Sequence, residues 1–190
     1  EYTPGKIEAE VKSGGDPVTE LDLRLDELLK NELCTDGEGW LSEETVDDPS
    51  RLKKEYVWIV DPLDGTKEFV EGIDQWCISI GLSRDSKVVA GGILNPASGE
   101  KFIGSRETGV KLNGQDVGVC KRGELSGATV LASRSEIKRG QWDWFEDKKC
   151  NVVPMGSVAY KLARVAAGLA DATFTLVKKN EWDIAAGTLL

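Results

Sequence analysis

One stretch decides how the chain is interpreted, and it reads Trp58-Ile59-Val60-Asp61-Pro62-Leu63-Asp64-Gly65-Thr66. Its apolar first half predicts a buried strand that delivers Asp61 at its carboxyl end, where Pro62 turns the chain. Asp64 follows three residues later, so the two carboxylates can converge on a shared cation. Gly65 and Thr66 then offer free backbone N–H groups at a helix start, which is a natural seat for phosphate oxygens. The alternative is a pair of consecutive turns, because Asp, Pro and Gly are the usual turn residues.

Three further acidic segments lie where a cation site would need them. The first contains Glu43 and Glu44, the second contains Asp22, and the third contains Asp183. Each has a plain alternative: a solvated turn for the glutamate pair, and a helix N-cap for either aspartate. Carboxylates about 4 Å apart repel by about 1 kcal/mol in water and by about 4 kcal/mol at an effective dielectric of 20, so a cluster implies a compensating cation. With oxygen ligands only, we expect Mg2+, Mn2+ or Ca2+ and not zinc or copper.

The composition removes several chemistries. The 190 residues include no histidine, which excludes Ser-His-Asp and Cys-His catalysis and His-ligated zinc. The formal charge of −9 argues against partners such as a nucleic-acid polymer or an anionic membrane. The four cysteines form no C-x-x-C pair, and no apolar run approaches the roughly 18 residues of a membrane span. We therefore expect a cytoplasmic protein whose catalysis uses carboxylates, hydroxyls, lysines or bound metal.

The hydrophobic pattern predicts two parts of different rhythm. Leucines at helical spacing predict a helix over 19–33, and short extended segments follow over 56–60, 76–83, 87–94, 100–104 and 109–112. The hairpin pair Asn113-Gly114 closes the last of them, which favours an antiparallel meander. After about residue 125 strands and helices alternate, with strands over 128–132, 151–153 and 172–177 and helices over 136–146 and 157–169.

We expect an N-terminal α+β lobe over 1–124, which carries most of the metal ligands, and a C-terminal α/β lobe over 125–190. The last helix begins near Ile184 and reaches the chain end without a capping residue or a basic last turn. We therefore expect the sequence to be part of a longer chain.

Two other classes of phosphate-handling protein are excluded by motif spacing. The haloacid-dehalogenase phosphatases carry D-x-D-G-T, with two aspartates two residues apart. Asp61 and Asp64 are three apart, which favours paired metal ligation over an aspartyl-phosphate nucleophile. No G-x-x-x-x-G-K-[ST] occurs, so a P-loop NTPase is excluded as well.

Four segments, taken in order, resemble the motifs of the inositol monophosphatase superfamily of Mg2+-dependent, lithium-sensitive phosphatases. They are 16–22 (D-P-V-T-E-L-D), 42–44 (S-E-E), 61–66 (D-P-L-D-G-T) and 182–186 (W-D-I-A-A). The resemblance implies an α+β fold, the αβαβα layered sandwich of the sugar phosphatases, with an antiparallel sheet in the first half and a smaller mixed sheet in the second. Dimers are common in the family, so a homodimer is compatible with the resemblance.

The resemblance also assigns roles to the matched residues. The expected ligands are Glu43, Asp61 and the Leu63 carbonyl for one Mg2+, and Asp61, Asp64 and Asp183 for a second. Thr66 with Glu43 would activate the attacking water, and Asp22 would hold or support a more weakly bound third ion. The phosphate would lie on the backbone amides of Gly65 and Thr66, near Gly156 and Ser157. Mn2+ could replace Mg2+, whereas Li+ or Ca2+ would inhibit.

The resemblance implies a small phosphorylated metabolite as the substrate, and the motifs of one branch of the superfamily match best. Lys67-Glu68-Phe69 and Ser133-Arg134-Ser135 resemble the 3′(2′),5′-bisphosphate nucleotidases, with Glu136 in place of that branch's histidine. This predicts hydrolysis of 3′-phosphoadenosine 5′-phosphate to AMP and phosphate. Arg134, Lys178 or Lys179 would contact the second phosphate, although a lysine pair in an exposed loop is more often only solvated.

Three alternatives remain open at this point. Inositol-1-phosphate is the first, although the glutamate that contacts the inositol ring in that branch is replaced here by Thr175 and Leu176. Histidinol phosphate is the second. The third is a divalent-cation binding module without catalysis, which the Thr66 hydroxyl beside the phosphate seat argues against, because ion binding alone does not need it.

Overall fold

The computed structural model describes residues 2–11 and 17–190, and a sheet of seven strands is its largest element. Its strands lie side by side in chain order: β3 (Gly39–Ser42), β4 (Tyr56–Asp64), β5 (Cys77–Arg84), β6 (Lys87–Asn95), β7 (Glu100–Ser105), β8 (Gly109–Leu112) and β9 (Gln115–Val117). The expected antiparallel meander is confirmed from β4 to β9, whereas β3 runs parallel to β4. Asn113 and Gly114 both have positive φ, as the tight turn between β8 and β9 requires.

A second sheet has three strands in the order β11 (Asn151–Met155), β10 (Thr129–Ser133) and β12 (Ala172–Thr173). Both of its described pairs are parallel, where a mixed sheet was expected. The expected boundary between residues 124 and 125 falls in the irregular segment between β9 and β10. The division into two lobes stays a proposal, because α5 (Glu181–Leu189), from the second half, packs on the large sheet.

Two expected elements of the second half are corrected by the structure. The helix expected over 136–146 is interrupted: α3 (Arg134–Lys138) ends before Gly140, which has a φ of 68°, and the 3-10 helix η2 (Asp143–Lys148) follows. The strand expected over 172–177 ends at Thr173, because the next residues turn away from β10 and bind the side chain of Glu136 instead.

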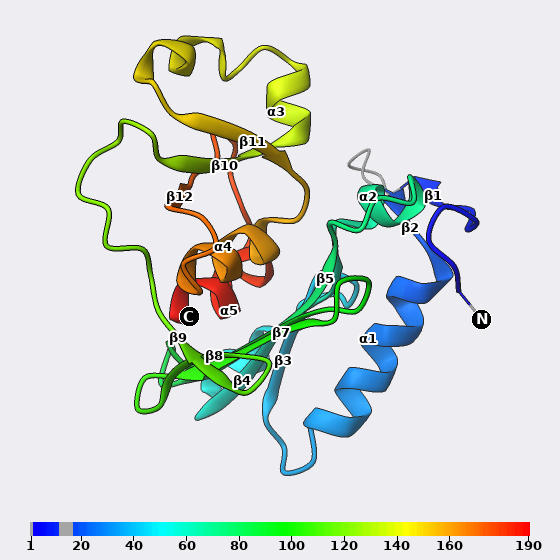
Figure 1. The fold of residues 1–190 in the computed structure, drawn as a ribbon. Coiled ribbons are helices and arrows are strands. Elements are labelled where there is room, and N and C mark those ends of the chain that lie inside the picture. Colours follow the sequence, from blue (N-terminus) through cyan, green and yellow to red (C-terminus); the bar gives the residue numbers. More distant parts are fainter. Residues whose placement is uncertain (1, 12–16) are drawn as a thin grey trace.

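The layers stack in the order helix, sheet, helix, sheet, helix (Figure 1). In that view α1 (Glu20–Leu33) lies on one side of the large sheet, and α4 (Val158–Ala166) with α5 lies on the other. The small sheet covers α4 and α5, and α3 with η2 forms the outer layer. The αβαβα sandwich is thereby confirmed. The shorter elements are β1 (Glu10–Val11), β2 (Pro17–Val18), η1 (Pro49–Lys53) and α2 (Thr66–Val70).

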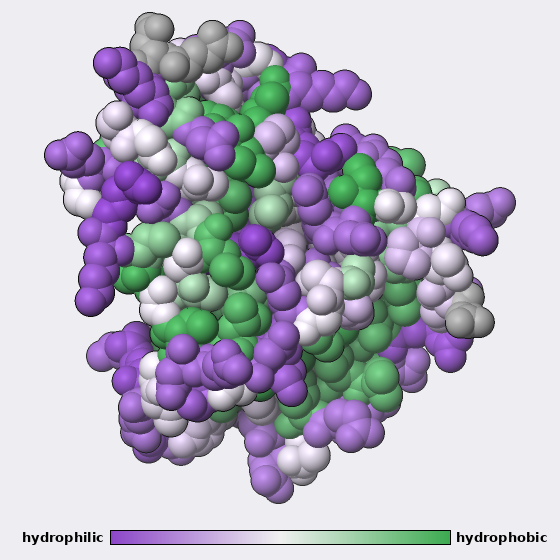
Figure 2. Space-filling model, in the orientation of Figure 1, coloured by the Kyte–Doolittle hydropathy of each residue, from purple (hydrophilic) through white to green (hydrophobic). Residues whose placement is uncertain are grey.

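The apolar core follows these layers. Between the large sheet and the α4–α5 pair, Cys77, Ile93 and Phe102 pack against Tyr160 and Ala186. A second cluster lies between the small sheet and the outer layer of α3 and η2, and it includes Trp142 and Phe145. On the face drawn in Figure 2, hydrophilic residues cover the rim and hydrophobic residues gather toward the middle. None of the described helices combines the length and the apolar character that crossing a membrane would require.

Two glycines let α5 approach the sheet closely. Gly81 of β5 and Gly91 of β6 are paired across the sheet. A Cβ atom built at Gly81 would lie 3.1 Å from the Ala185 Cβ, and one at Gly91 would lie 3.0 Å from the Ala186 carbonyl oxygen. Neither position has room for a side chain, so the helix backbone rests almost directly on the strands. This packing brings Asp183, in the first turn of α5, beside β4.

Candidate active site

Three carboxylates from three separate elements meet at the end of β4. Glu43 follows β3, Asp61 belongs to β4, and Asp183 lies in the first turn of α5. One oxygen of each lies within 4.8 Å of the others. The parallel pairing of β3 with β4 explains part of this arrangement, because the Glu43 amide continues the ladder by donating to the Val60 carbonyl (3.3 Å).

The environment of Asp61 tests whether a cation fits this cluster. Asp61 is 2 % exposed, and its Oδ1 accepts a hydrogen bond from the Leu63 amide (3.0 Å). Its Oδ2 is buried and has no hydrogen-bond partner among the residues that the structure describes. Burial, followed by the charges of Asp64, Glu43 and Asp183, raises the pKa of Asp61 well above its ordinary value. An orphaned carboxylate oxygen among other carboxylates is costly unless a cation compensates it, and an all-oxygen donor set suits Mg2+.

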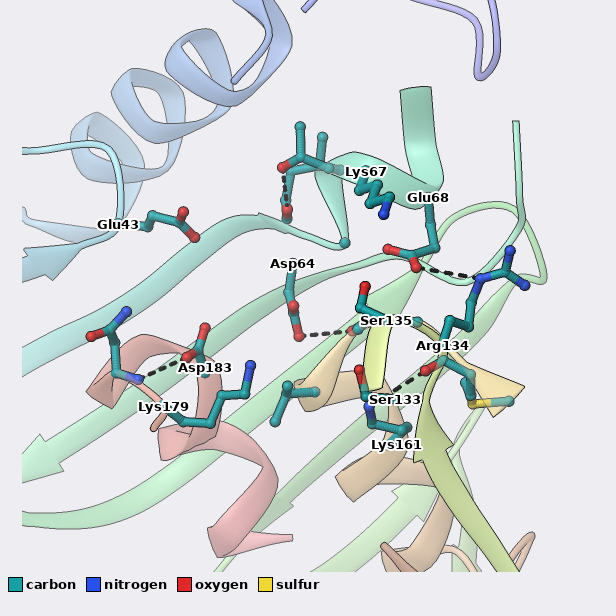
Figure 3. A pocket seen from close by; sticks show the side chains of 18 of the residues that line it. Glu43, Asp64, Lys67, Glu68, Ser133, Arg134, Ser135, Lys161, Lys179 and Asp183 are labelled. Atoms are coloured by element: carbon teal, nitrogen blue, oxygen red, sulfur yellow. Dashed lines mark hydrogen bonds and ion pairs between the residues drawn. The ribbon is translucent and has the colours of Figure 1, made fainter. Parts of the chain in front are cut away.

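Asp64 is the last residue of β4, and its side chain is hydrogen-bonded to the start of α4. Its Oδ2 accepts hydrogen bonds from the Ser157 hydroxyl (2.8 Å) and the Ala159 amide (2.6 Å), at the start of α4. Burial raises the pKa of Asp64 to about 6, and these two hydrogen bonds oppose the rise. Ser157, expected near the phosphate, therefore also anchors a candidate ligand. Figure 3 shows Asp64 between Glu43 and Asp183 on one side and the 133–135 segment on the other.

Thr66 and Asp22 form a second unit beside the cluster. The Thr66 hydroxyl lies 2.8 Å from Asp22 Oδ1 and 3.0 Å from the Leu63 carbonyl oxygen, so its proton has two acceptors. The other oxygen of Asp22 accepts from the amide (2.8 Å) and hydroxyl (2.5 Å) of Thr19, at the start of α1. The oxygen of the hydroxyl therefore stays available to accept a hydrogen bond from another group.

The capping and functional interpretations of the two helix-start aspartates hold together. Asp22 and Asp183 are both the third residue of their helix, each in a reciprocal capping box, with Thr19 and Asn180 as the N-caps. The Asn180 amide donates to Asp183 Oδ2 (2.7 Å). A carboxylate has two oxygens, so one can cap a helix while the other serves the site. The third-ion role expected for Asp22 stays a prediction.

These groups line a cavity of about 400 Å³. Its acidic lining residues are Glu43, Asp64 and Asp183, with Gly65 and Thr66 beside them, and together with Asp61 we call these carboxylates the acidic wall. The same lining includes five cationic side chains, which we call the basic wall: Lys67, Arg134, Lys161, Lys178 and Lys179. Figure 3 shows Lys179 extending toward the space between Asp183 and Asp64. All of the expected substrate residues, including Gly156 and Ser157, therefore lie on one cavity. Asp16, in the first matched segment, lies outside the described residues.

The sequence analysis missed two buried charged residues of this cavity. Lys161 is 3 % exposed, and its Nζ lies 3.4 Å from the Met155 carbonyl oxygen. Burial lowers the pKa of Lys161, while the charge of Asp64 opposes that change. Glu68 is 7 % exposed and lies 3.6 Å from the Arg134 guanidinium. The spacing of Lys161, four residues after Ser157 on one helix face, is the signal that could have found it.

Gly156 has a packing role that its sequence context did not reveal. A Cβ atom built there would lie 2.4 Å from the Cγ and Cδ atoms of Glu68. Glycine therefore allows the Glu68 side chain to lie against the start of α4. Burial raises the pKa of Glu68, and the Arg134 charge opposes that effect.

The fold and the carboxylate cluster define a metal-dependent phosphomonoesterase of the αβαβα type. The model of the inositol monophosphatase family matches residues 1–190. The chain therefore belongs to the inositol monophosphatase family, whose members are metal-dependent phosphoric monoester hydrolases.

Individual relatives agree with this assignment. The chain is 34 % identical to an inositol-1-monophosphatase of Mesorhizobium japonicum, over 97 % of this chain and 72 % of the relative. It is 33 % identical to the Nus factor SuhB of Pseudomonas aeruginosa, over 72 % of this chain and 53 % of the relative. Among solved structures, an IMPase of Thermotoga maritima superposes with a TM-score of 0.87 at 28 % identity, covering 97 % of this chain and 73 % of that one.

Proposed function

We propose that this chain hydrolyses a small phosphate monoester in the cavity between the two walls, with inositol-1-phosphate as the first candidate substrate. The observation that carries the proposal is the orphaned Oδ2 of Asp61, which lies in the cluster with Glu43 and Asp183. The relatives named inositol-1-monophosphatase favour this substrate over adenosine 3′,5′-bisphosphate, which the sequence motifs had put first.

The metal ligands we propose are those that the sequence motifs indicate. Glu43, Asp61 and Asp183 form the cluster, and Asp64 and the Leu63 carbonyl lie at its edge. When bound, divalent cations supply Lewis-acid polarisation of the phosphoryl group and a lowered pKa for the attacking water.

The chain's own residues orient the reacting groups. Because the Thr66 hydroxyl donates its proton to Asp22 or to the Leu63 carbonyl, its oxygen can accept a hydrogen bond from the attacking water. Glu43 would share in removing the water's proton. The backbone amides of Gly65 and Thr66 would hold the phosphate, and the cationic side of the cavity would attract it.

Adenosine 3′,5′-bisphosphate is the second candidate, favoured by a specific observation. Arg134, Lys178 and Lys179 all line the same cavity as the carboxylates. Thr175 has no carboxylate to offer to a sugar ring, and its hydroxyl donates to Glu136 instead. A substrate with a second anionic group would find cationic partners on this wall.

Phosphate release from matched substrates tests the proposal. Inositol-1-phosphate, adenosine 3′,5′-bisphosphate and histidinol phosphate are compared at equal concentration with Mg2+, with EDTA and with Mg2+ plus Li+. We expect turnover that requires Mg2+, falls in Li+ and has its highest kcat/KM for inositol-1-phosphate. A higher kcat/KM for the bisphosphate would replace the first candidate by the second. Ion binding without turnover of any substrate would leave only a cation-binding module.

A further inference from the structure

A fully buried carboxylate outside the metal cluster connects two distant segments of the cavity wall. Glu136, in the first turn of α3, is 0 % exposed. Its Oε1 accepts hydrogen bonds from the Thr175 hydroxyl (2.5 Å) and the Leu176 amide (3.1 Å). Its Oε2 accepts one from the Trp142 indole N–H (2.9 Å). Both oxygens are therefore held by donors from other segments.

The loop over 174–179 depends on this carboxylate for its position. The loop runs from the end of β12 to the start of α5 without regular structure. Among the described residues, the hydrogen bonds that join this loop to other segments all end on Glu136. Trp142, which also binds Glu136, stacks on Phe174 with ring centroids 4.2 Å apart. Glu136 and its indole partner thus fix the first half of the loop.

The charge on Glu136 is part of this arrangement. Burial acts to raise the pKa of Glu136, but the hydrogen bonds from Thr175, Trp142 and Leu176 outweigh burial, and the pKa is lowered. A neutral side chain of the same size could not replace it, because an amide has one acceptor oxygen where three donors converge. The second half of the same loop carries Lys178 and Lys179 to the cavity.

We propose that Glu136 is a positioning residue that sets substrate preference, by holding the 174–179 loop so that Lys178 and Lys179 line the cavity and can contact a second anionic group of the substrate. This inference rests on the proposed phosphatase function. Among the described residues, Glu136 makes no hydrogen bond to the phosphate seat or to the carboxylate cluster, and its charge acts on Lys161 of the same cavity. We expect its main effect on substrate binding and not on the chemical step.

The test compares Glu136→Gln with the wild-type chain on two substrates. For adenosine 3′,5′-bisphosphate we expect KM to rise about tenfold with kcat nearly unchanged, because one set of donors loses its acceptor and the loop moves. For inositol-1-phosphate we expect little change in either constant. Glu107→Gln, at an exposed hairpin, is the matched control, and thermal unfolding checks that each variant is folded. Thr175→Val, which removes one donor only, tests the same loop with a smaller disturbance.

A double-variant comparison identifies the route of the effect. Lys178→Ala/Lys179→Ala should reproduce the rise in KM, and adding Glu136→Gln to it should cause no further rise. Equal losses on both substrates, a fall in kcat alone, or additive effects would overturn the proposal. If the wild-type chain turns over neither substrate, the proposed function fails separately. In that case the affinities of the wild-type chain and of Glu136→Gln for adenosine 3′,5′-bisphosphate are compared by calorimetry in Ca2+. A weaker affinity of the variant would support the proposal, and equal affinities would overturn it.

Discussion

The acidic wall and the basic wall of the cavity differ in the kinds of element that carry their charged residues. The acidic wall takes Glu43, Asp61 and Asp183 from a strand end, a central strand and a helix start. Apart from Lys161, which is buried on α4, the basic wall includes Arg134 from a five-residue helix and Lys178 and Lys179 from an irregular loop. The acidic groups are buried or half-buried, whereas Arg134 is 37 % exposed and both lysines are exposed. The fixed wall thus suits chemistry that every substrate shares, and the looser wall suits groups that differ between substrates.

The walls also differ in what they cost the folded state. Grouped carboxylates repel one another and lose hydration, so the acidic wall is unfavourable until a cation is bound. Long cationic side chains at a solvent boundary keep most of their hydration and cost little. Changes on the acidic wall should therefore affect both activity and stability, and changes on the basic wall should affect mainly KM.

The largest expected effect follows from Asp61→Asn. Removing this carboxylate should lower kcat by at least roughly 10³-fold in saturating Mg2+, a loss comparable to removing a preorganised electrostatic group from an active site. The metal-free variant should unfold no more easily than the wild type, because a buried, unpartnered charge has been removed. Phosphate release and denaturant titration measure the two effects, with Asp36→Asn as an exposed control. Activity within tenfold of wild type would contradict the assignment of Asp61.

A pH effect on the metal-free protein should come next in size. Folded Asp64 holds its proton up to a pKa of about 6, whereas an unfolded aspartate releases it near 3.8. The folded state therefore binds more protons between these values, and the free energy of unfolding should fall as pH rises from about 4 to above 6. The difference of about two pKa units corresponds to a loss on the order of 3 kcal/mol.

Denaturant titrations in EDTA at several pH values measure this slope. Asp64→Asn should remove the contribution of this group, and saturating Mg2+ should suppress it in the wild type. An identical slope in the wild type and in Asp64→Asn, both in EDTA, would show that the folded environment of Asp64 does not hold the proton.

Gly187→Ala should moderately lower the free energy of unfolding, and through α5 it should also disturb the acidic wall. A Cβ atom at this position of α5 would lie 2.5 Å from the Leu162 Cβ of α4. Overpacking of this kind costs about 1–3 kcal/mol, offset in part by the higher helix propensity of alanine, up to about 1 kcal/mol. Because α5 carries Asp183, activity should fall as well. Gly123→Ala, with no atom of the described residues within 4 Å of the new Cβ, is the control.

Arg134→Ala should have the smallest effect, on the basic wall. Its guanidinium lies 3.6 Å from Glu68 and 3.9 Å from Glu71, and it is partly exposed. Screened pairs of this kind contribute about 1 kcal/mol or less, so we expect at most about a fivefold rise in KM for adenosine 3′,5′-bisphosphate, which shrinks at high salt. Lys138→Ala, on the same helix, is the comparison. A large fall in kcat would instead indicate that Arg134 acts in the chemical step, as the acidic wall is expected to do.

The acidic wall could be predicted from sequence because short-range patterns specify it. The buried apolar run over 58–60 fixes where Asp61 and Asp64 lie, although β4 continues through Asp64 with a register shift after Asp61, where a strand end and a turn at Pro62 were expected. Capping signals fix the helix starts that carry Asp22 and Asp183. The pairing of β3 with β4 was not predicted, although it brings Glu43 to the cluster. That pairing joins segments separated by the 3-10 helix η1, so no local pattern reports it.

The basic wall was predicted less well for the same reason. Thr175 and Leu176 have the local pattern of a strand, but they leave the sheet to bind a carboxylate 39 and 40 residues earlier in the chain. Lys161 occupies the face of an apolar helix, and the neighbouring carboxylates of Asp64, Glu136 and Glu68 explain why a lysine can be buried there. Contacts between distant segments decide both cases.

The glycine pair on β5 and β6 has a consequence for ion selection. Gly81 and Gly91 set how deeply α5 lies on the sheet, and Asp183 is only two residues ahead of Ala185, the residue that Gly81 faces. The distance between Asp183 and Asp61 is thus governed by two residues without side chains that never meet the ion. A single methyl group added to the sheet could change which cation radius the carboxylates accept, while every ligand remained in place.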